Sequence, residues 1–149
     1  MGQAATQSGI TRSELFLTTK ILSAGGSIDK SYQKCLDSVK KIDDREDGYV
    51  DLFLIHSPSG GAAARKEMWL ALERLFEEGR AKSIGVSNFG IGHIEELKDY
   101  AKVWPPHVNQ IEVCLCAILF ILYSCFVIRS PWSAGKTTLL NHLLILLFA

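Results

Sequence analysis

The sequence lacks the main features of secreted and nucleic-acid-binding proteins. Its 149 residues contain only four cysteines, and no apolar signal core precedes them in MGQAATQSGITRSE. We therefore expect reduced cytosolic thiols and no disulfides. Cys114 and Cys116 form a C-x-C pair without a second ligand pair, which argues against a zinc site. Sixteen basic and sixteen acidic side chains balance, so no strong field favours binding to nucleic acid or to anionic lipid.

Acidic residues are absent from the end of the chain. No acidic residue follows Glu112. The rest of the chain contains the apolar runs CLCAILFILYSCFVI and LLNHLLILLFA, and its only ionised side chains are Arg129 and Lys136. The first run is shorter than the roughly 17–25 residues of a membrane-spanning helix, so a membrane anchor remains an alternative. This change in composition divides the chain into residues 1–113 and a hydrophobic tail of residues 114–149.

Three short apolar runs each end in a polar residue. LFLTTK closes on Lys20, VDLFLIH on His56, and SIGVSN on Ser87 and Asn88, while a fourth run, HVNQIEV, carries Gln110 in its middle. Helix-like segments follow the first three runs, and this alternation is typical of parallel βαβ units, which bind ligands at the carboxyl ends of their strands. The residue types predict a site that polarises a carbonyl group and holds a cofactor.

Helical periodicity predicts helices between the runs. Ser27 is expected to cap the first helix, whose recurring positions are Ile28, Tyr32, Cys35, Leu36, Val39 and Ile42. HSPSGGAAAR is predicted as a loop, and the helix after it ends at Gly79. HIEELKDYAKV is predicted to be helical and to be stopped by Pro105 and Pro106. Four βα-type steps with short connections predict part of a (β/α) barrel, and an open sheet is the alternative.

These segments resemble the aldo-keto reductase family. LFLTTK, DLFLIHSP, LFEEGRAKSIGVSNFG and PPHVNQIEV are similar to the third to sixth barrel strands of that family, over roughly residues 8–113. The resemblance implies an α/β fold, namely a partial (β/α)8 TIM barrel of roughly strands 3 to 6, followed by an apolar tail outside the family pattern. It also implies a cytoplasmic NADP-dependent oxidoreductase that transfers hydride between NADPH and a small aldehyde or ketone.

The same resemblance implies roles for individual residues. Lys20 and His56 match the lysine and histidine of the family's Asp, Tyr, Lys, His tetrad. Ser87, Asn88 and Gln110 match residues that hold the nicotinamide carboxamide. Hydride delivery places negative charge on the carbonyl oxygen, so a proton donor must lie against that oxygen. A lysine ammonium favours the phenolate form of a nearby tyrosine, and an imidazole can orient the substrate oxygen through a hydrogen bond.

Half of that tetrad has no counterpart in the sequence. The family's tyrosine and aspartate precede its third strand, and Tyr32, Tyr49 and Tyr100 lie elsewhere. Four strands of an eight-stranded barrel leave two unpaired edges, so we expect this chain to be incomplete and inactive alone. Our hypothesis is a truncated or mispredicted reading of a reductase gene whose tail lies outside the coding frame. Sequencing the transcript across the codons for Val113 to Leu115 tests it.

Two other functions fit the same sequence. The first is a non-catalytic, membrane-associated fragment anchored by its tail, which predicts detergent-dependent recovery from membranes. The second is a regulatory module that keeps a cofactor pocket without chemistry, which predicts saturable NADPH binding without turnover. Neither the preferred carbonyl substrate nor a choice between NADPH and NADH is predicted.

Overall fold

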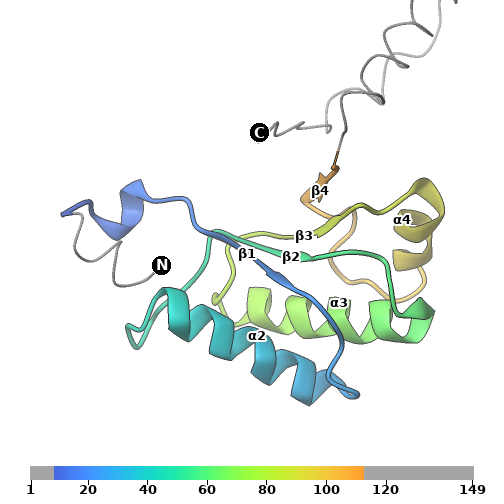
Figure 1. The fold of residues 1–149 in the computed structure, drawn as a ribbon, viewed down its shortest axis with the longest axis horizontal. Helices are drawn as coiled ribbons and strands as arrows, with labels where there is room; N and C mark the ends of the chain where they lie inside the picture. Colours follow the sequence, from blue (N-terminus) through green and yellow to red (C-terminus); the bar gives the residue numbers. More distant parts are fainter. Residues whose placement is uncertain (1–8, 113–149) are drawn as a thin grey trace, which may run out of the picture.

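The computed structural model describes residues 9–112 (Figure 1). It contains a four-stranded parallel sheet in the order β1-β2-β3-β4. The strands are β1 (Thr18–Ile21), β2 (Leu52–Ile55), β3 (Ile84–Ser87) and β4 (Val108–Gln110). A short 3-10 helix, η1 (Arg12–Glu14), precedes them, and the α-helices are α2 (Ile28–Ile42), α3 (Gly61–Glu77) and α4 (Ile91–Leu97).

The strand order decides between the two architectures expected from the sequence. Neighbouring strands in the sheet are consecutive in the chain, whereas a doubly wound open sheet reverses its order at a switch point. The helices α2 and α3, which connect β1 to β2 and β2 to β3, lie on the same face of the sheet (Figure 1). A sheet wound in one direction with helices outside it is a section of a (β/α) barrel.

The main core lies between the sheet and its helices. Alternate strand residues supply one side of it, because successive side chains of a strand point to opposite faces. Phe53 and Ile55 of β2 pack there with Trp69 and Leu72 of α3, and all four are 0% exposed. The almost continuous apolar run of β2 is explained by burial on both faces, since all four of its residues are buried.

Helix α2 begins as the sequence predicts. The Ser27 side chain accepts a hydrogen bond from the backbone N–H of Lys30 and caps the helix. Cys35 and Val39 are buried against the core, but Ile28 is 42% exposed and does not belong to the buried face. Ile28 is the first residue of the helix, and at that position it lies beyond the edge of the packed surface.

Helix α3 begins earlier than predicted, because part of the expected loop HSPSGGAAAR is helical. The structure starts α3 at Gly61. Gly60 and Gly61 both have positive φ, which glycine adopts without steric cost, and the three alanines that follow are the strongest helix formers. The end of the helix matches the prediction, since Gly79 has φ 73°.

Helix α4 is shorter than predicted. It ends at Leu97, so Pro105 and Pro106 do not terminate it. The carboxylate of Glu73 accepts hydrogen bonds from the backbone N–H groups of Lys102 (2.6 Å) and Val103 (2.8 Å). These two donors are therefore unavailable to a helix that continued beyond Ala101, and the chain turns towards β4 there.

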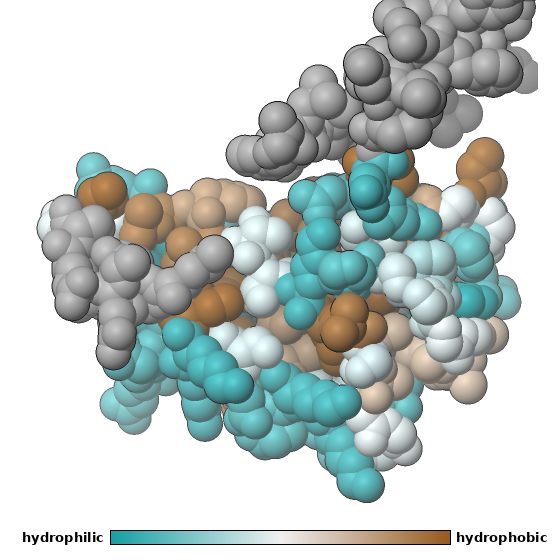
Figure 2. All heavy atoms as spheres, in the orientation of Figure 1, coloured by the Kyte–Doolittle hydropathy of each residue, from teal (hydrophilic) through white to brown (hydrophobic). Residues whose placement is uncertain are grey.

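The surface along α2 is hydrophilic, whereas apolar atoms are visible around β1 (Figure 2). Phe16 and Leu22, on either side of β1, are 71% and 73% exposed. Within residues 9–112, no helix is long and apolar enough to cross a membrane. The tail on which the anchor hypothesis rests lies outside the described residues.

Candidate active site

The polar residues singled out in the sequence lie at the carboxyl end of the sheet. Lys20 of β1 aligns with Leu54 of β2, and His56 follows two residues later. The backbone N–H of His56 donates to the carbonyl of Ile21 at 3.0 Å, which extends the β1–β2 ladder to this point. With a strand spacing of about 4.8 Å and a rise of about 3.3 Å per residue, the Cα atoms of Lys20 and His56 are about 8 Å apart.

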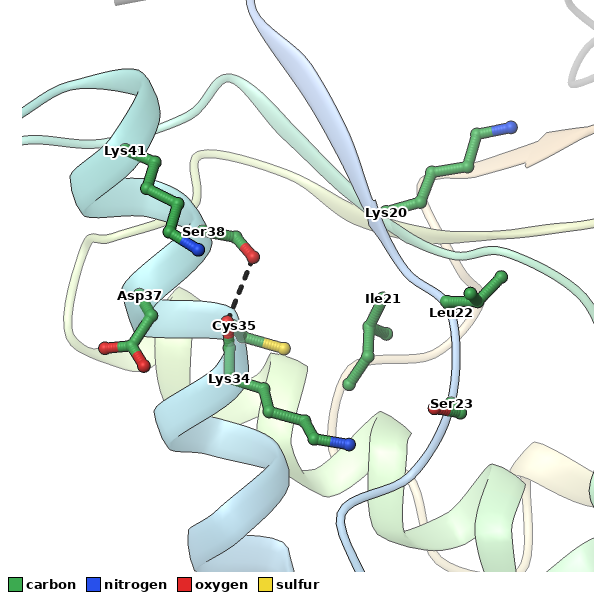
Figure 3. A pocket seen from close by; sticks show the side chains of 9 residues that line it. All are labelled: Lys20, Ile21, Leu22, Ser23, Lys34, Cys35, Asp37, Ser38 and Lys41. Carbon is green, nitrogen blue, oxygen red and sulfur yellow. Dashed lines mark hydrogen bonds between the residues drawn. The ribbon is translucent and has the colours of Figure 1, made fainter.

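Lys20 and Ser87 share the face of the sheet opposite the helices. Their strand neighbours Ile21 and Val86 belong to the helix-side core, so the alternation of side chains directs Lys20 and Ser87 the other way. Figure 3 shows this directly for β1, where Lys20 points away from Ile21 and Cys35.

His56 and Gln110 follow the same alternation. His56 is one residue beyond Ile55, which packs on the helix side. Gln110 ends β4, instead of lying in the middle of a longer strand as predicted, and it aligns with Ser87. The structure therefore brings the lysine, the histidine and the Ser87–Gln110 pair to one rim and one face of the sheet.

A groove near Lys20 is a separate feature. It has a volume of about 370 Å³ and lies between β1 and α2, with Lys34 and Lys41 among its lining residues. The Lys34 ammonium donates to the carbonyl of Ala24 at 3.2 Å. Cys35 also lines the groove, and burial raises the pKa of its thiol to about 12. Lys20 borders the groove, but its side chain points away from Cys35 and Lys34 (Figure 3), and His56 does not line the groove. The groove is therefore distinct from the rim that carries Lys20 and His56.

The Ser87–Gln110 pair has unused hydrogen-bonding capacity. Ser87 is 1% exposed, and its hydroxyl accepts only a long hydrogen bond of 3.4 Å from the side-chain amide of Asn88 within the described part of the chain. The Oε1 atom of Gln110 is buried and has no hydrogen-bond partner among residues 9–112. Buried polar atoms are usually paired, so this oxygen marks a place for an external donor.

Asn88 is tied by two hydrogen bonds to the end of β4 and to the residues just after it. Its backbone N–H donates to the Gln110 carbonyl at 2.9 Å, and its Oδ1 accepts from the N–H of Glu112 at 2.9 Å. The side-chain oxygen is therefore engaged within the protein, and the side-chain amide is the group available to a ligand.

The two candidate catalytic side chains, Lys20 and His56, have no hydrogen-bond or ion-pair partner in the described part of the chain. Neither the Lys20 ammonium nor the His56 ring makes a hydrogen bond or ion pair with any residue between 9 and 112. Each is therefore available to a bound molecule at the rim.

No described tyrosine supplies the expected proton donor. The phenols of Tyr32 and Tyr100 donate to Glu78 (2.5 Å) and Glu96 (3.2 Å). Burial, with these carboxylates, raises the pKa of both phenols. This is the opposite of what an acid active near neutral pH requires.

Comparison with known proteins gives the family. The aldo/keto reductase family model matches residues 1–120. The chain belongs to the aldo/keto reductase family. Glyoxal reductase of Bacillus subtilis is 40% identical over 113 residues, which are 75% of this chain and 38% of that protein. The resemblance stated from the sequence is confirmed.

Solved structures of the family show the same fold. An aldo/keto reductase from Brucella melitensis has a TM-score of 0.68 and 41% identity, over 76% of this chain and 43% of that chain. A Bombyx mori aldo-keto reductase in complex with NADP has a TM-score of 0.62 and 34% identity, over 74% of this chain and 37% of that chain. The chain thus spans less than half the length of these relatives, and the predicted partial barrel is confirmed.

Sequence reasoning missed two glutamates of α3 that hold connecting segments, one of them next to the candidate site. Oε1 of Glu67 accepts from the backbone N–H groups of Gly25 (2.9 Å) and Gly26 (3.0 Å) and from the hydroxyl of Ser31 (2.6 Å). The Ser31 hydrogen bond is the main cause that lowers the pKa of Glu67. This carboxylate fixes the loop that leaves β1 just after Lys20.

The second of these, Glu73, is 3% exposed. Besides the N–H groups of Lys102 and Val103, its Oε1 accepts from the indole Nε1 of Trp69 at 3.0 Å. Both glutamates lie in a helix with several other charged residues, most of them exposed, so no sequence signal distinguishes them from surface residues.

Proposed function

We propose that this chain carries the carbonyl-binding and nicotinamide-binding part of an NADP(H)-dependent site that reduces small aldehydes or ketones. The observation that carries the proposal is the convergence of Lys20, His56, Ser87 and Gln110 at one rim and on one face of the sheet. Ligands of (β/α) barrels bind at this rim. The B. mori relative in complex with NADP supports the choice of cofactor.

The residues present fit the carboxamide of a nicotinamide. A carboxamide offers two N–H donors and one acceptor. The buried Gln110 Oε1, which lacks a partner among residues 9–112, accepts one donor, and the Ser87 hydroxyl accepts the other or donates to the carboxamide oxygen. The Asn88 amide supplies a further donor at the same rim. A bound reduced nicotinamide supplies the hydride for carbonyl reduction.

Lys20 and His56 act at the substrate carbonyl. The positive charge of Lys20 stabilises negative charge at the oxygen and favours the ionised form of a hydroxyl held next to it. The His56 ring donates a hydrogen bond that fixes the orientation of the carbonyl. The proton donor is not among residues 9–112, so we expect this chain to bind the nicotinamide end of the cofactor and not to turn over alone. A cytosolic location belongs to the same proposal.

Titration of the full chain with reduced nicotinamide mononucleotide and with NADPH, followed by nicotinamide fluorescence, tests the proposal. The candidate residues contact only the nicotinamide end, so both ligands should saturate with Kd values within about threefold, a difference below about 1 kcal/mol. Gln110→Leu should weaken both by at least about tenfold, because it removes the acceptor.

Gln33→Leu is the matched control. Gln33 donates to Asp37 on the exposed side of α2, away from the rim, so both Kd values should match those of the wild type. No saturable binding of either ligand, or equal weakening by both substitutions, would contradict the proposal.

A further inference from the structure

The turn between β3 and α4 is held from β4 by the side chain of Asn109. Its Nδ2 donates to the carbonyl of Phe89 at 2.8 Å, and its Oδ1 accepts from the N–H of Phe89 at 3.3 Å. One carboxamide thus pairs with both backbone groups of a residue that is 20 positions away in sequence. The match of two donors with two acceptors fixes this peptide more firmly than a single hydrogen bond would.

The turn needs such support because of its backbone conformation. Asn88 has φ 59°, and it is the only non-glycine residue between 9 and 112 with a positive φ. Asparagine tolerates this conformation better than most residues, but it remains uncommon. Phe89 follows with 2% exposure and anchors the turn in the core. Asn109 therefore clamps the residue next to the unusual backbone position.

Asn109 and Gln110 work from opposite sides of β4. Gln110 aligns with Ser87 and Asn109 with Val86, and Val86 packs on the helix side. Because successive strand residues face opposite ways, Gln110 turns to the ligand face while Asn109 reaches Phe89 from the other face. Asn109 is thereby excluded from direct contact with a ligand held by Ser87 and Gln110.

We propose that Asn109 is a positioning residue, which sets the direction of the Ser87 hydroxyl and the Asn88 amide by clamping Phe89. The inference rests on the proposed nicotinamide site for its consequence, but the clamp itself is a separate structural claim. The two neighbouring carboxamides thus have different roles: that of Asn109 holds the turn, and that of Gln110 binds the ligand.

The test uses two substitutions in the full chain. Asn109→Asp keeps the acceptor, loses the donor to the Phe89 carbonyl and preserves the shape. Asn109→Leu removes both hydrogen bonds at similar volume. Gln33→Glu and Gln33→Leu on the exposed side of α2 are the matched controls for the added charge and for the lost amide.

Amide hydrogen exchange measures directly whether the side chain of Asn109 protects the turn. We expect the amides of Asn88 and Phe89 to exchange about tenfold faster in Asn109→Leu, with a smaller increase in Asn109→Asp, as expected for the loss of one or two hydrogen bonds. The amide of Phe53 in β2, which donates to the carbonyl of Ser83, should keep its wild-type exchange rate. Unchanged exchange at Asn88 and Phe89, or equal acceleration at Phe53, would overturn the proposal.

Binding of reduced nicotinamide mononucleotide separates positioning from simple structural support. Both Asn109 variants should raise its Kd by about three- to tenfold, and both Gln33 controls should leave it unchanged. Faster exchange at the turn with an unchanged Kd would overturn the positioning role. If the wild-type chain does not bind the nucleotide at all, the proposed function fails, and the exchange data alone then decide whether Asn109 holds the turn.

Discussion

At the scale of single residues, burial lowers the reactivity of the Cys35 thiol. It is 1% exposed, and desolvation raises the pKa of its thiol to about 12. Since the thiolate is the reactive form, we predict that alkylation of Cys35 at pH 8 is at least about 100-fold slower in the native chain than in urea. Mass spectrometry of the alkylated peptides measures this rate at Cys35 separately from the other cysteines. Labelling at the unfolded rate in native buffer would refute the burial of this thiol.

The ionised Asp43 carboxylate makes the stability of the folded state depend on pH. Its 5%-exposed side chain accepts from Arg45 and from the N–H of Tyr49. The Arg45 hydrogen bond is the largest cause that holds the pKa of Asp43 well below its usual range. A lowered folded-state pKa adds stability above the unfolded pKa of about 3.9 and loses it as pH falls towards the folded value.

We therefore predict that Asp43→Asn lowers the free energy of unfolding by about 1–3 kcal/mol at pH 7. Urea unfolding of both proteins at pH 7, 5 and 3 should show this gap narrowing below about pH 4, where the Asp43 carboxylate of the unfolded wild-type chain begins to take up a proton while that of the folded chain stays ionised. A gap of constant size across this range would show that the charge of Asp43 is not its source.

The site residues could be predicted from the sequence to different extents. Lys20 and His56 each end an apolar strand-like run, so both their position after a strand and the resemblance to the family identify them. Asn109 carries no such signal, because its partner Phe89 is brought to it only by the pairing of β3 with β4. Glu73 is missed for the same reason, since a helical glutamate looks exposed until the packing of α3 is known.

At the scale of elements, the connection from α4 to β4 depends on one carboxylate. Glu73→Ala would leave the Trp69 indole and the N–H groups of Lys102 and Val103 without their acceptor. We predict a loss of about 2–4 kcal/mol in the free energy of unfolding.

Glu77→Ala is the control for this prediction. Glu77 lies on the same helix, and its ion pair with Lys102 is exposed, so its loss should cost less than about 1 kcal/mol. Urea unfolding curves measure both values. Similar losses for the two variants would disprove a special role for Glu73.

The elements were predictable where local chemistry determines them. The cap at Ser27 and the left-handed Gly79 depend on neighbouring residues only, and both agree with the structure. The path from α4 to β4 was not predictable, because the Glu73 carboxylate that accepts from the N–H groups of Lys102 and Val103 comes from another helix. The early start of α3 could have been predicted from its run of alanines, which favour a helix. The glycines and the proline just before that run instead favoured a loop.

At the scale of the whole molecule, residues 9–112 form a four-stranded section of an aldo/keto reductase barrel. We predict that the purified chain does not oxidise NADPH above the blank with small aldehydes, because no tyrosine among residues 9–112 supplies the expected proton donor beside Lys20. Absorbance at the NADPH band measures this. Turnover that is abolished by Lys20→Met would show that a donor is present after all.

Exchanging residues 9–112 for the corresponding segment of the B. subtilis glyoxal reductase tests the catalytic role of Lys20. That relative supplies the remaining barrel and, by our account, the proton donor. We predict NADPH-dependent glyoxal reduction by the folded chimaera and a loss of at least about 100-fold in kcat with Lys20→Met, the scale of a lost catalytic group. A folded chimaera without turnover, or one whose turnover survives Lys20→Met, would contradict the central claim.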